Sequence, residues 1–324
     1  MNIKLSSRNL TAALFAILFV AGLCARASAA GTAISSCQTL SSPGNYFLTA
    51  NLTASGSGCL VISADNVAID MKGKTITGNG TGAGIDDNGV EHDFAIIANG
   101  NIKNFQTGID LSESGQAIIS NVDSSNNTGE GIFIDRCCDT LNAVTANGNA
   151  DTGIVIESDD SSLSNIQANG NAGGGIVITS DDNTIVASTV SNNKDVGVVI
   201  ENCCNFVIGS KIQKNSGDGL TLENGDNGVI TSTTSNNTGN GMSLSGDDMV
   251  TASKSDNNGG SGIDYNGARF GVLSGVKANN NTTNGVNMNC RGSTASLTAK
   301  NNGAGNLVQT VSNGPCANVD LKAP

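Results

Sequence analysis

The residues of this sequence best suited to chemistry form a column of acidic pairs. The pairs Asp159-Asp160 and Asp181-Asp182 stand six and seven residues after regularly spaced glycines. Carboxylates stacked at strand spacing repel one another, by about 1 kcal/mol per pair in water. A bound cation would relieve that repulsion, and oxygen ligands suit Ca²⁺. The four aspartates are therefore candidate calcium ligands, and the alternative is that they are hydrated turn residues.

Four further residues are candidates for catalysis. Arg136 lies beside the acidic column, and a lyase or epimerase needs a cation or an arginine to hold a uronate. Glu201 and Glu223 are carboxyl groups of the type that glycoside hydrolysis uses in pairs. His92, the single histidine, is flanked by two acids and has the chemistry of a general base. The structural alternatives are a salt-bridged surface turn for Arg136 and a place in an N-terminal cap for His92.

The first thirty residues have the order of a secretory signal. Two basic residues, Lys4 and Arg8, precede an apolar run from Leu10 to Leu23, and small residues follow as far as Ala30. The apolar run is shorter than the roughly 20 residues that a membrane span needs. No later segment is long and apolar enough to span a membrane. We therefore expect a secreted or periplasmic protein without a membrane span in its mature chain.

A short internal repeat organises the rest of the chain. Glycines that precede an apolar-x-apolar triplet stand at positions 131, 153, 175, 197, 219 and 241, which are five consecutive steps of 22. The local period of two is typical of strands, and helical solenoid repeats are longer. Similar glycines continue the series on both sides, and an asparagine stands four residues before each of the ten glycines from Gly108 to Gly305. These residues are Asn104, Asn127, Asn149, Asn171, Asn193, Asn215, Asn237, Asn258, Asn281 and Asn301.

The repeat predicts an all-β fold in which each copy forms one rung and stacks on the next, as a parallel coil of about 11 rungs. Aliphatic positions such as Ile132, Ile154 and Ile176 would stack as interior ladders. The asparagines would pass amide hydrogen bonds from rung to rung. We divide the chain into a signal peptide (1–30), an N-terminal cap and first rung (31–75), the repeats (76–310) and a C-terminal cap or tail (311–324).

An oxidising compartment favours disulfides among the eight cysteines that follow the signal. Cys37 and Cys59 are separated by one repeat, so neighbouring rungs bring their Cα atoms within disulfide range. Cys290 and Cys316 are separated by slightly more than one repeat, and a bond between them would pin the C-terminal tail across the last turn.

Two further cysteine pairs are adjacent in sequence, Cys137-Cys138 and Cys203-Cys204. They stand three rungs apart, which is too far for a bond between the pairs. Each pair is a vicinal disulfide, two free thiols or a pair of ligands for a soft metal.

The glycines, the asparagine column and the aliphatic ladders together resemble the right-handed parallel β-helix repeat proteins of the pectin-lyase-like class. The resemblance covers about residues 35–310. The stretch SCQTLSSPGNYFLTANLTASGSGCLVISADNVAIDMKGKTITGNG is similar to the N-terminal segment of exported bacterial members. Some of these members are grouped with the NosD-like, carbohydrate-binding and sugar-hydrolase repeats. The resemblance implies right-handed winding and a polysaccharide-related role. The resemblance to NosD-like members also makes copper a candidate metal for the thiol pairs to bind.

Composition and missing motifs narrow the function. A net charge of −12 excludes a nucleic-acid binder held by a basic face. The Gly-His-Gly turn and later Arg-x-Lys of the related hydrolases are missing from the sequence. We expect a non-catalytic surface or structural module that binds a polysaccharide or a cell-surface component. The alternative is a calcium-assisted lyase or epimerase acting on uronate-rich polysaccharide.

Overall fold

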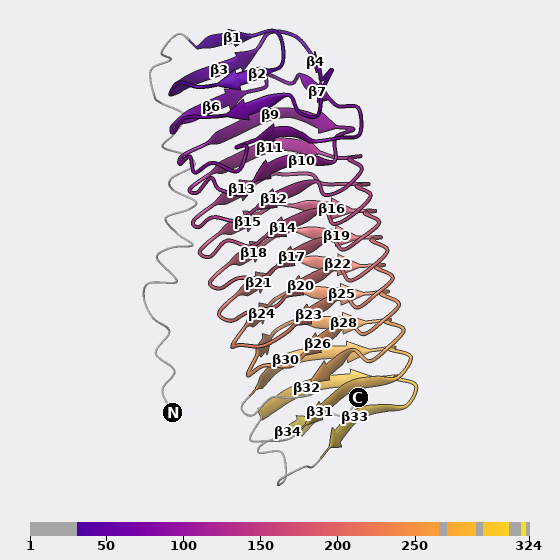
Figure 1. The fold of residues 1–324 in the computed structure, drawn as a ribbon. Coiled ribbons are helices and arrows are strands. Elements are labelled where there is room, and N and C mark those ends of the chain that lie inside the picture. Colours follow the sequence, from indigo (N-terminus) through magenta and orange to yellow (C-terminus); the bar gives the residue numbers. More distant parts are fainter. Residues whose placement is uncertain (1–30, 266–270, 290–293, 311–318, 322–324) are drawn as a thin grey trace.

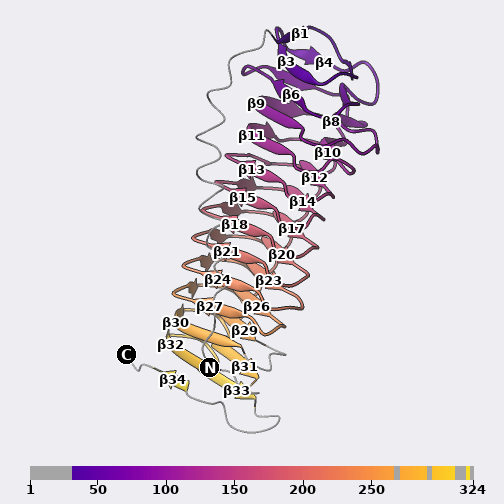
Figure 2. The same cartoon turned by 90° about the vertical axis from the view of Figure 1, so that its left-hand side faces the viewer.

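Parallel strands wound into an elongated stack make up the described chain. The computed structural model describes residues 31–265, 271–289, 294–310 and 319–321, and these residues form no helix. Figures 1 and 2 show the chain advancing from one end of the stack to the other. The stack has about 12 turns, some 22 residues apart, so the predicted all-β parallel coil of about 11 rungs is confirmed.

One side of the stack is a sheet of 13 strands, whose neighbours are successive turns of the coil. Its strands are β2 (Gln38–Leu40), β5 (Leu60–Ile62), β8 (Ala83–Asp86), β10 (Thr107–Leu111), β12 (Ile132–Ile134), β14 (Ile154–Ile156), β17 (Ile176–Ile178), β20 (Val198–Ile200), β23 (Leu220–Leu222), β26 (Met242–Leu244), β29 (Ile263–Tyr265), β31 (Asn284–Asn289) and β33 (Gly305–Thr310).

A sheet of 21 strands forms the rest of the wall, and most central turns contribute two strands to it. Its strands are β1 (Thr32–Ile34), β3 (Gly44–Leu48), β4 (Leu52–Thr53), β6 (Val67–Asp70), β7 (Thr75–Thr77), β9 (Ile96–Lys103), β11 (Ile118–Ser124), β13 (Thr140–Asn142), β15 (Ser162–Ser164), β16 (Gln167–Asn169), β18 (Thr184–Val186), β19 (Thr189–Ser191), β21 (Phe206–Ile208), β22 (Lys211–Gln213), β24 (Gly228–Ile230), β25 (Thr233–Ser235), β27 (Met249–Thr251), β28 (Lys254–Asp256), β30 (Val272–Asn279), β32 (Thr294–Lys300) and β34 (Val319–Leu321).

Aliphatic side chains fill the interior of the coil. Ile132, Ile154, Ile176 and Val198 lie in register on four successive strands, and all four are fully buried. Residues that alternate with them along each strand face outward, because successive side chains of a strand point to opposite faces of its sheet. The apolar core is therefore one continuous column, and each turn buries its apolar face against its neighbours.

An asparagine ladder joins successive turns inside the coil. Oδ1 of Asn193 accepts hydrogen bonds from the backbone N–H of Asn171 at 2.9 Å and from its Nδ2 at 3.0 Å. A Cβ on Gly175 would lie 2.8 Å from Nδ2 of Asn193 and 2.6 Å from the carbonyl oxygen of Gly197, so this close approach requires glycine. The same rung-to-rung bonds connect Asn127, Asn149, Asn171, Asn193, Asn215, Asn237, Asn258 and Asn281.

The predicted ladder is wrong at both ends. The residue in register at the N-terminal end is Phe105, whose backbone N–H donates to Asn127, whereas Asn104 is exposed. At the other end Asn302 takes the ladder position in place of Asn301. Asn104 and Asn301 have φ of 59° and 55°, a left-handed backbone that asparagine tolerates. Asparagine thus suits both the ladder position and the left-handed position directly before it. The distance in sequence from the next glycine does not show which of the two an asparagine occupies.

A second buried ladder, which was not predicted, runs through the residues just before β13, β15, β18, β21, β24 and β27. In each step a backbone N–H donates to the side-chain oxygen one turn later. Asp139 and Asp248, near the two ends, are 1 % and 0 % exposed, and burial raises the pKa of each to about 7. The members are Asp139, Ser161, Asn183, Asn205, Asn227 and Asp248.

A disulfide joins the first two turns of the 13-stranded sheet. Cys37 and Cys59 are bonded with a Cα–Cα distance of 4.4 Å, directly before the paired strands β2 and β5. This predicted bond is confirmed. Cys290, Cys316 and the predicted signal peptide lie outside the described residues. Within the described ranges there is no helix long and apolar enough to cross a membrane.

The asparagine ladder should carry a measurable part of the stability. Asn193→Ala leaves the buried N–H and amide of Asn171 without their acceptor, so we expect the free energy of unfolding to fall by about 2–4 kcal/mol. Urea unfolding followed by circular dichroism measures this change. The exposed neighbour provides a control, since Lys194→Ala should change stability by less than about 0.5 kcal/mol. Equal effects of the two substitutions would contradict a structural role of the ladder.

Asp139 should make stability depend on pH. Its pKa is raised from 3.8 to about 7, so the folded protein holds a proton that the unfolded chain loses above pH 4. Stability contributed by this group is therefore full below about pH 4 and falls as the pH rises to 7. Asp139→Asn, which copies Asn183 in the same ladder, should stabilise the protein at pH 8 by on the order of 1–4 kcal/mol and change little at pH 4. Unfolding free energies at both pH values measure this, and a variant no more stable at pH 8 would contradict it.

Candidate functional site

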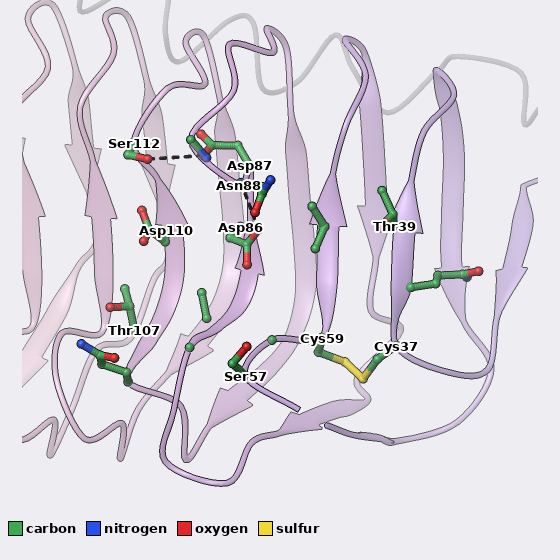
Figure 3. A pocket seen from close by; sticks show the side chains of 17 residues that line it. Cys37, Thr39, Ser57, Cys59, Asp86, Asp87, Asn88, Thr107, Asp110 and Ser112 are labelled. Carbon is green, nitrogen blue, oxygen red and sulfur yellow. Dashed lines mark hydrogen bonds between the residues drawn. A yellow bond between two sulfur atoms is a disulfide. The ribbon is translucent and has the colours of Figure 1, made fainter. Parts of the chain in front are cut away.

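A cleft of about 690 Å³ lies on the outer face of the 13-stranded sheet, in the N-terminal part of the stack (Figure 3). Two aspartates from neighbouring strands line it, because Asp86 on β8 lies in register with Asp110 on β10. Each stands two residues after a repeat glycine, Gly84 and Gly108, at the outward-facing position of its strand. The two carboxyl groups therefore sit side by side on adjacent turns.

Burial in the cleft disfavours the charged form of both carboxyl groups. Burial raises the pKa of Asp86 to about 6, and the nearby carboxylates of Asp110 and Asp87 act in the same direction. The pKa of Asp110 is also raised, first by burial and then by Asp87 and Glu130. Oδ1 of Asp110 is buried and has no hydrogen-bond partner within the described structure. Oδ1 of Asp86, by contrast, accepts the backbone N–H of Asn88 at 3.0 Å, so the unsatisfied acceptor of the pair is Asp110.

Asp87 builds one wall of the cleft rather than offering a free carboxylate. It is 1 % exposed, and its oxygens accept hydrogen bonds from the backbone N–H groups of Gly89 at 3.0 Å and Glu113 at 2.8 Å. Figure 3 shows the further bond from the hydroxyl of Ser112. Asp87 therefore holds the loop after β10 against the loop after β8.

The rest of the lining is mainly polar, with Val61, Ala83 and the Cys37–Cys59 disulfide as its apolar part, and it carries no positive charge. Amide and hydroxyl side chains come from Gln38, Thr39, Ser57, Gln106 and Thr107, and the lining contains no lysine, arginine or histidine. The cleft thus combines hydrogen-bonding groups with two carboxyl groups that lack a cationic partner.

The sequence analysis did not identify Asp86 or Asp110, although a signal for them was present. Both occupy the outward position that Phe133 and Val155 hold on the next two strands of the sheet. The steps from Gly84 to Gly108 and on to position 131 are longer than the regular step of the later repeats.

The candidate calcium ligands bond to the backbone of the following turn. Oδ1 of Asp159 accepts the N–H of Asp181 at 2.9 Å, and Oδ1 of Asp181 accepts the N–H of Cys203 at 3.0 Å. Burial and the nearby carboxylates of Asp160, Asp181 and Asp159 raise the pKa of Asp182, so like charges do crowd here. However, the described residues contain no group of three or more histidine, cysteine, aspartate or glutamate side chains that could hold a metal ion.

Arg136 forms ion pairs with two acidic residues from the loops beside the cleft. Its Nη2 lies 2.5 Å from Glu113 and 3.8 Å from Glu91. His92, on the same loop as Glu91, lies 3.8 Å from Asp65, and its Nε2 is buried without a partner in the described structure. Neither Arg136 nor His92 lines the cleft, and both lie against acidic residues of neighbouring loops.

Glu201 and Glu223 lie far from the cleft. They directly follow the paired strands β20 and β23, and both are exposed. Successive turns lie about 4.8 Å apart, which is closer than the roughly 6.5–9.5 Å between the carboxyl groups of an inverting glycosidase. The backbone positions of this pair therefore do not match the spacing that an inverting site needs.

The family comparison identifies a match over more than half of the chain. Residues 31–215 match the family model described as periplasmic copper-binding protein (NosD). None of the curated proteins compared with the chain matches it in sequence.

Three solved structures that share the fold belong to proteins that are named for an action on saccharides or were solved with a saccharide bound. The A-module of the mannuronan C-5 epimerase AlgE4 of Azotobacter vinelandii has a TM-score of 0.53 and 14 % identity, with 87 % of this chain and 91 % of that chain covered. The catalytic domain of a GH87 alpha-1,3-glucanase, solved with tetrasaccharides, has a TM-score of 0.59 and 11 % identity, with 90 % and 63 % covered. The tailspike protein of E. coli bacteriophage HK620, solved with a pentasaccharide, has a TM-score of 0.52 and 12 % identity, with 91 % and 60 % covered. At these identities the likeness establishes the fold alone.

Proposed function

Since this chain belongs to the NosD family, we propose that it is a periplasmic or secreted module that binds a polysaccharide in the cleft around Asp86 and Asp110, without cleaving it. The observation that carries this proposal is the cleft itself, with the carboxyl groups of Asp86 and Asp110 side by side on the outer face of the 13-stranded sheet and Oδ1 of Asp110 buried without a partner in the described structure. The saccharide-associated proteins that share the fold support the choice of a glycan as the ligand.

The lining suits sugar hydroxyl groups. Carboxylate oxygens accept hydrogen bonds, and the side chains of Gln38 and Gln106 both donate and accept them. Beside the aspartates, Phe133 continues the outward row on β12, in register with Asp110. An aromatic ring in this position offers an apolar surface to the hydrogen-bearing face of a sugar ring. A linear glycan can therefore follow the outward row from the cleft onto Phe133.

The charge of the cleft selects among glycans. A uronate would bring its carboxylate next to Asp86 and Asp110 with no cation to separate them, because the lining holds no basic side chain. An amino sugar would bring an ammonium group, which pairs with a carboxylate through a charge-assisted hydrogen bond. We infer that amino-sugar polysaccharides bind best, neutral polysaccharides less tightly and polyuronates weakest.

Copper, which the family description names, does not fit the donor set of the described residues. Copper(I) prefers thiolate and thioether ligands. Met71, Met242 and Met288 are buried in the core, and Cys203 is bonded to Cys204. Met249 is half-buried, but it begins β27, several turns away from Cys137 and Cys138. Two adjacent thiols remain, and no third cysteine, histidine or carboxylate joins them in a metal-binding group within the described ranges. The proposed function therefore does not involve copper.

The proposal is tested by measuring the binding of three matched oligosaccharide series to the purified protein by calorimetry. The series are glucosamine oligomers, N-acetylglucosamine oligomers of the same length, and oligouronates. We expect affinity to fall in that order. Absence of binding in all three series would overturn the proposed function.

Substitutions then locate the site. Asp110→Asn should weaken glucosamine-oligomer binding by about tenfold, because the ammonium group loses a charged partner. Asp86→Asn should act in the same way. Asp159→Asn removes an exposed carboxylate from the turn column outside the cleft and should leave the affinity within about twofold. Equal losses in the cleft variants and this control would contradict the location.

The alternative, a calcium-assisted lyase or epimerase, differs in its products and in its metal dependence. In that case oligouronates would yield unsaturated uronates, which absorb in the ultraviolet, or would change their uronate composition, in a calcium-dependent way. Millimolar Ca²⁺ would also raise the melting temperature, and Asp181→Ala would abolish the rise. We expect neither product nor a calcium-dependent shift, and a positive result in both assays would replace our proposal.

A further inference from the structure

The two adjacent-cysteine pairs occupy equivalent positions in the coil, on rungs that are three turns apart. Cys137-Cys138 stands three residues after the end of β12, and Cys203-Cys204 stands three residues after the end of β20. The second cysteine of each pair has a left-handed backbone, with φ of 75° at Cys138 and 68° at Cys204. Cys203 is bonded to Cys204, whereas Cys137 and Cys138 are free thiols. The same local fold therefore carries one closed and one open pair.

The left-handed conformation belongs to the turn and not to the disulfide. On the two turns between the pairs, Asp160 and Asp182 occupy the position of the second cysteine, with φ of 56° and 59°. The backbone N–H groups of Cys138 and Asp160 bond to the carbonyl oxygens of Asp159 and Asp181 on the next turn, at 2.9 and 3.2 Å. The stack thus holds residues 137 and 138 in the backbone form that the closed pair adopts.

Solvent access separates the two pairs. Cys137 and Cys138 are both exposed, whereas Cys203 and Cys204 are half-buried. Gly225, on the next turn, covers the closed pair so tightly that a Cβ on it would lie 2.3 Å from Cα of Cys203. A small disulfide reagent can therefore approach the first pair much more easily than the second.

The surroundings of Cys138 keep its thiol protonated. Cys138 is exposed at its surface but partly desolvated, and this desolvation, its contact with Cys137 and the carboxylates of Asp160 and Asp139 raise its pKa to about 12. Because the thiolate is the reacting species, this thiol reacts slowly with chance oxidants. Cys138 is therefore suited to the second, resolving step, in which the mixed disulfide on Cys137 already lies beside it, rather than to the first attack.

We propose that Cys137 and Cys138 form a reversible dithiol–disulfide site whose reactant is a small-molecule or protein disulfide. One cysteine thiolate attacks the reactant, forms a mixed disulfide and releases the first thiol. The neighbouring cysteine then attacks the mixed disulfide at the sulfur of its partner and releases the second thiol. The protein loses two electrons and two protons, and the reactant disulfide becomes two thiols.

The experiment is a redox titration of the full-length mature protein in glutathione buffers. After equilibration, remaining thiols are alkylated and the digested peptides are weighed by mass spectrometry. As the fraction of glutathione disulfide rises, the peptide with residues 137 and 138 should pass from two alkyl groups to none and become two hydrogens lighter than its thiol form. A peptide that keeps both thiols, or stops at a glutathione adduct, would overturn the proposal.

Two variants separate the role of the turn from simple proximity in sequence. Cys138→Ser should accumulate the mixed disulfide, because the resolving thiol is gone. A matched pair, Asp159→Cys with Asp160→Cys, is introduced on the next turn in a Cys137→Ser, Cys138→Ser background. It should close at the same glutathione ratio within about threefold, since the turn is the same. A pair that remains open there would show that the turn does not promote closure.

Discussion

Each turn of this protein satisfies the buried polar groups of the turn before it, and the rest of the structure depends on that constraint. A buried backbone N–H without an acceptor costs about 1–3 kcal/mol. Three ladders supply those acceptors: the asparagine ladder, the ladder from Asp139 to Asp248, and a serine ladder through Ser188, Ser210, Ser232 and Ser253. Because all three must stay in register, the length of a turn is nearly fixed.

The register of the buried ladders does not restrict the exposed turns or the side chains that face outward from the sheets. The repeat loses one residue between Leu244 and Asp248, in a surface turn, and the ladders on either side stay in register. On the outer face of the 13-stranded sheet most central turns carry apolar or hydroxyl side chains, whereas β8, β10 and β29 carry Asp86, Asp110 and Asp264. A binding site can therefore be built outside without disturbing the ladders inside.

The predictable features are those that repeat. A constant step makes Cys37 and Cys59 neighbours, and it makes Ile132 and Ile154 neighbours in the core, without any knowledge of how the chain bends. The cleft is not predictable in this way. It forms where the turns are longer than the regular repeat, and its wall depends on Asp87 holding the loop that carries Glu113. Contacts of this kind join irregular segments, and such segments have no repeating sequence pattern from which the contacts could be predicted.

The parallel coil, the residues that stack in its core and one disulfide can be predicted from the sequence, because they follow from a constant repeat and the pitch of a β-sheet. Which of two adjacent asparagines enters the ladder, and which carboxyl groups share a cleft, can be seen in the folded chain alone. Asn301 and Asn302 differ by one position, yet only Asn302 points its amide oxygen at the turn before it. Such choices depend on the local path of the backbone, and that path is set by packing against the neighbouring turns.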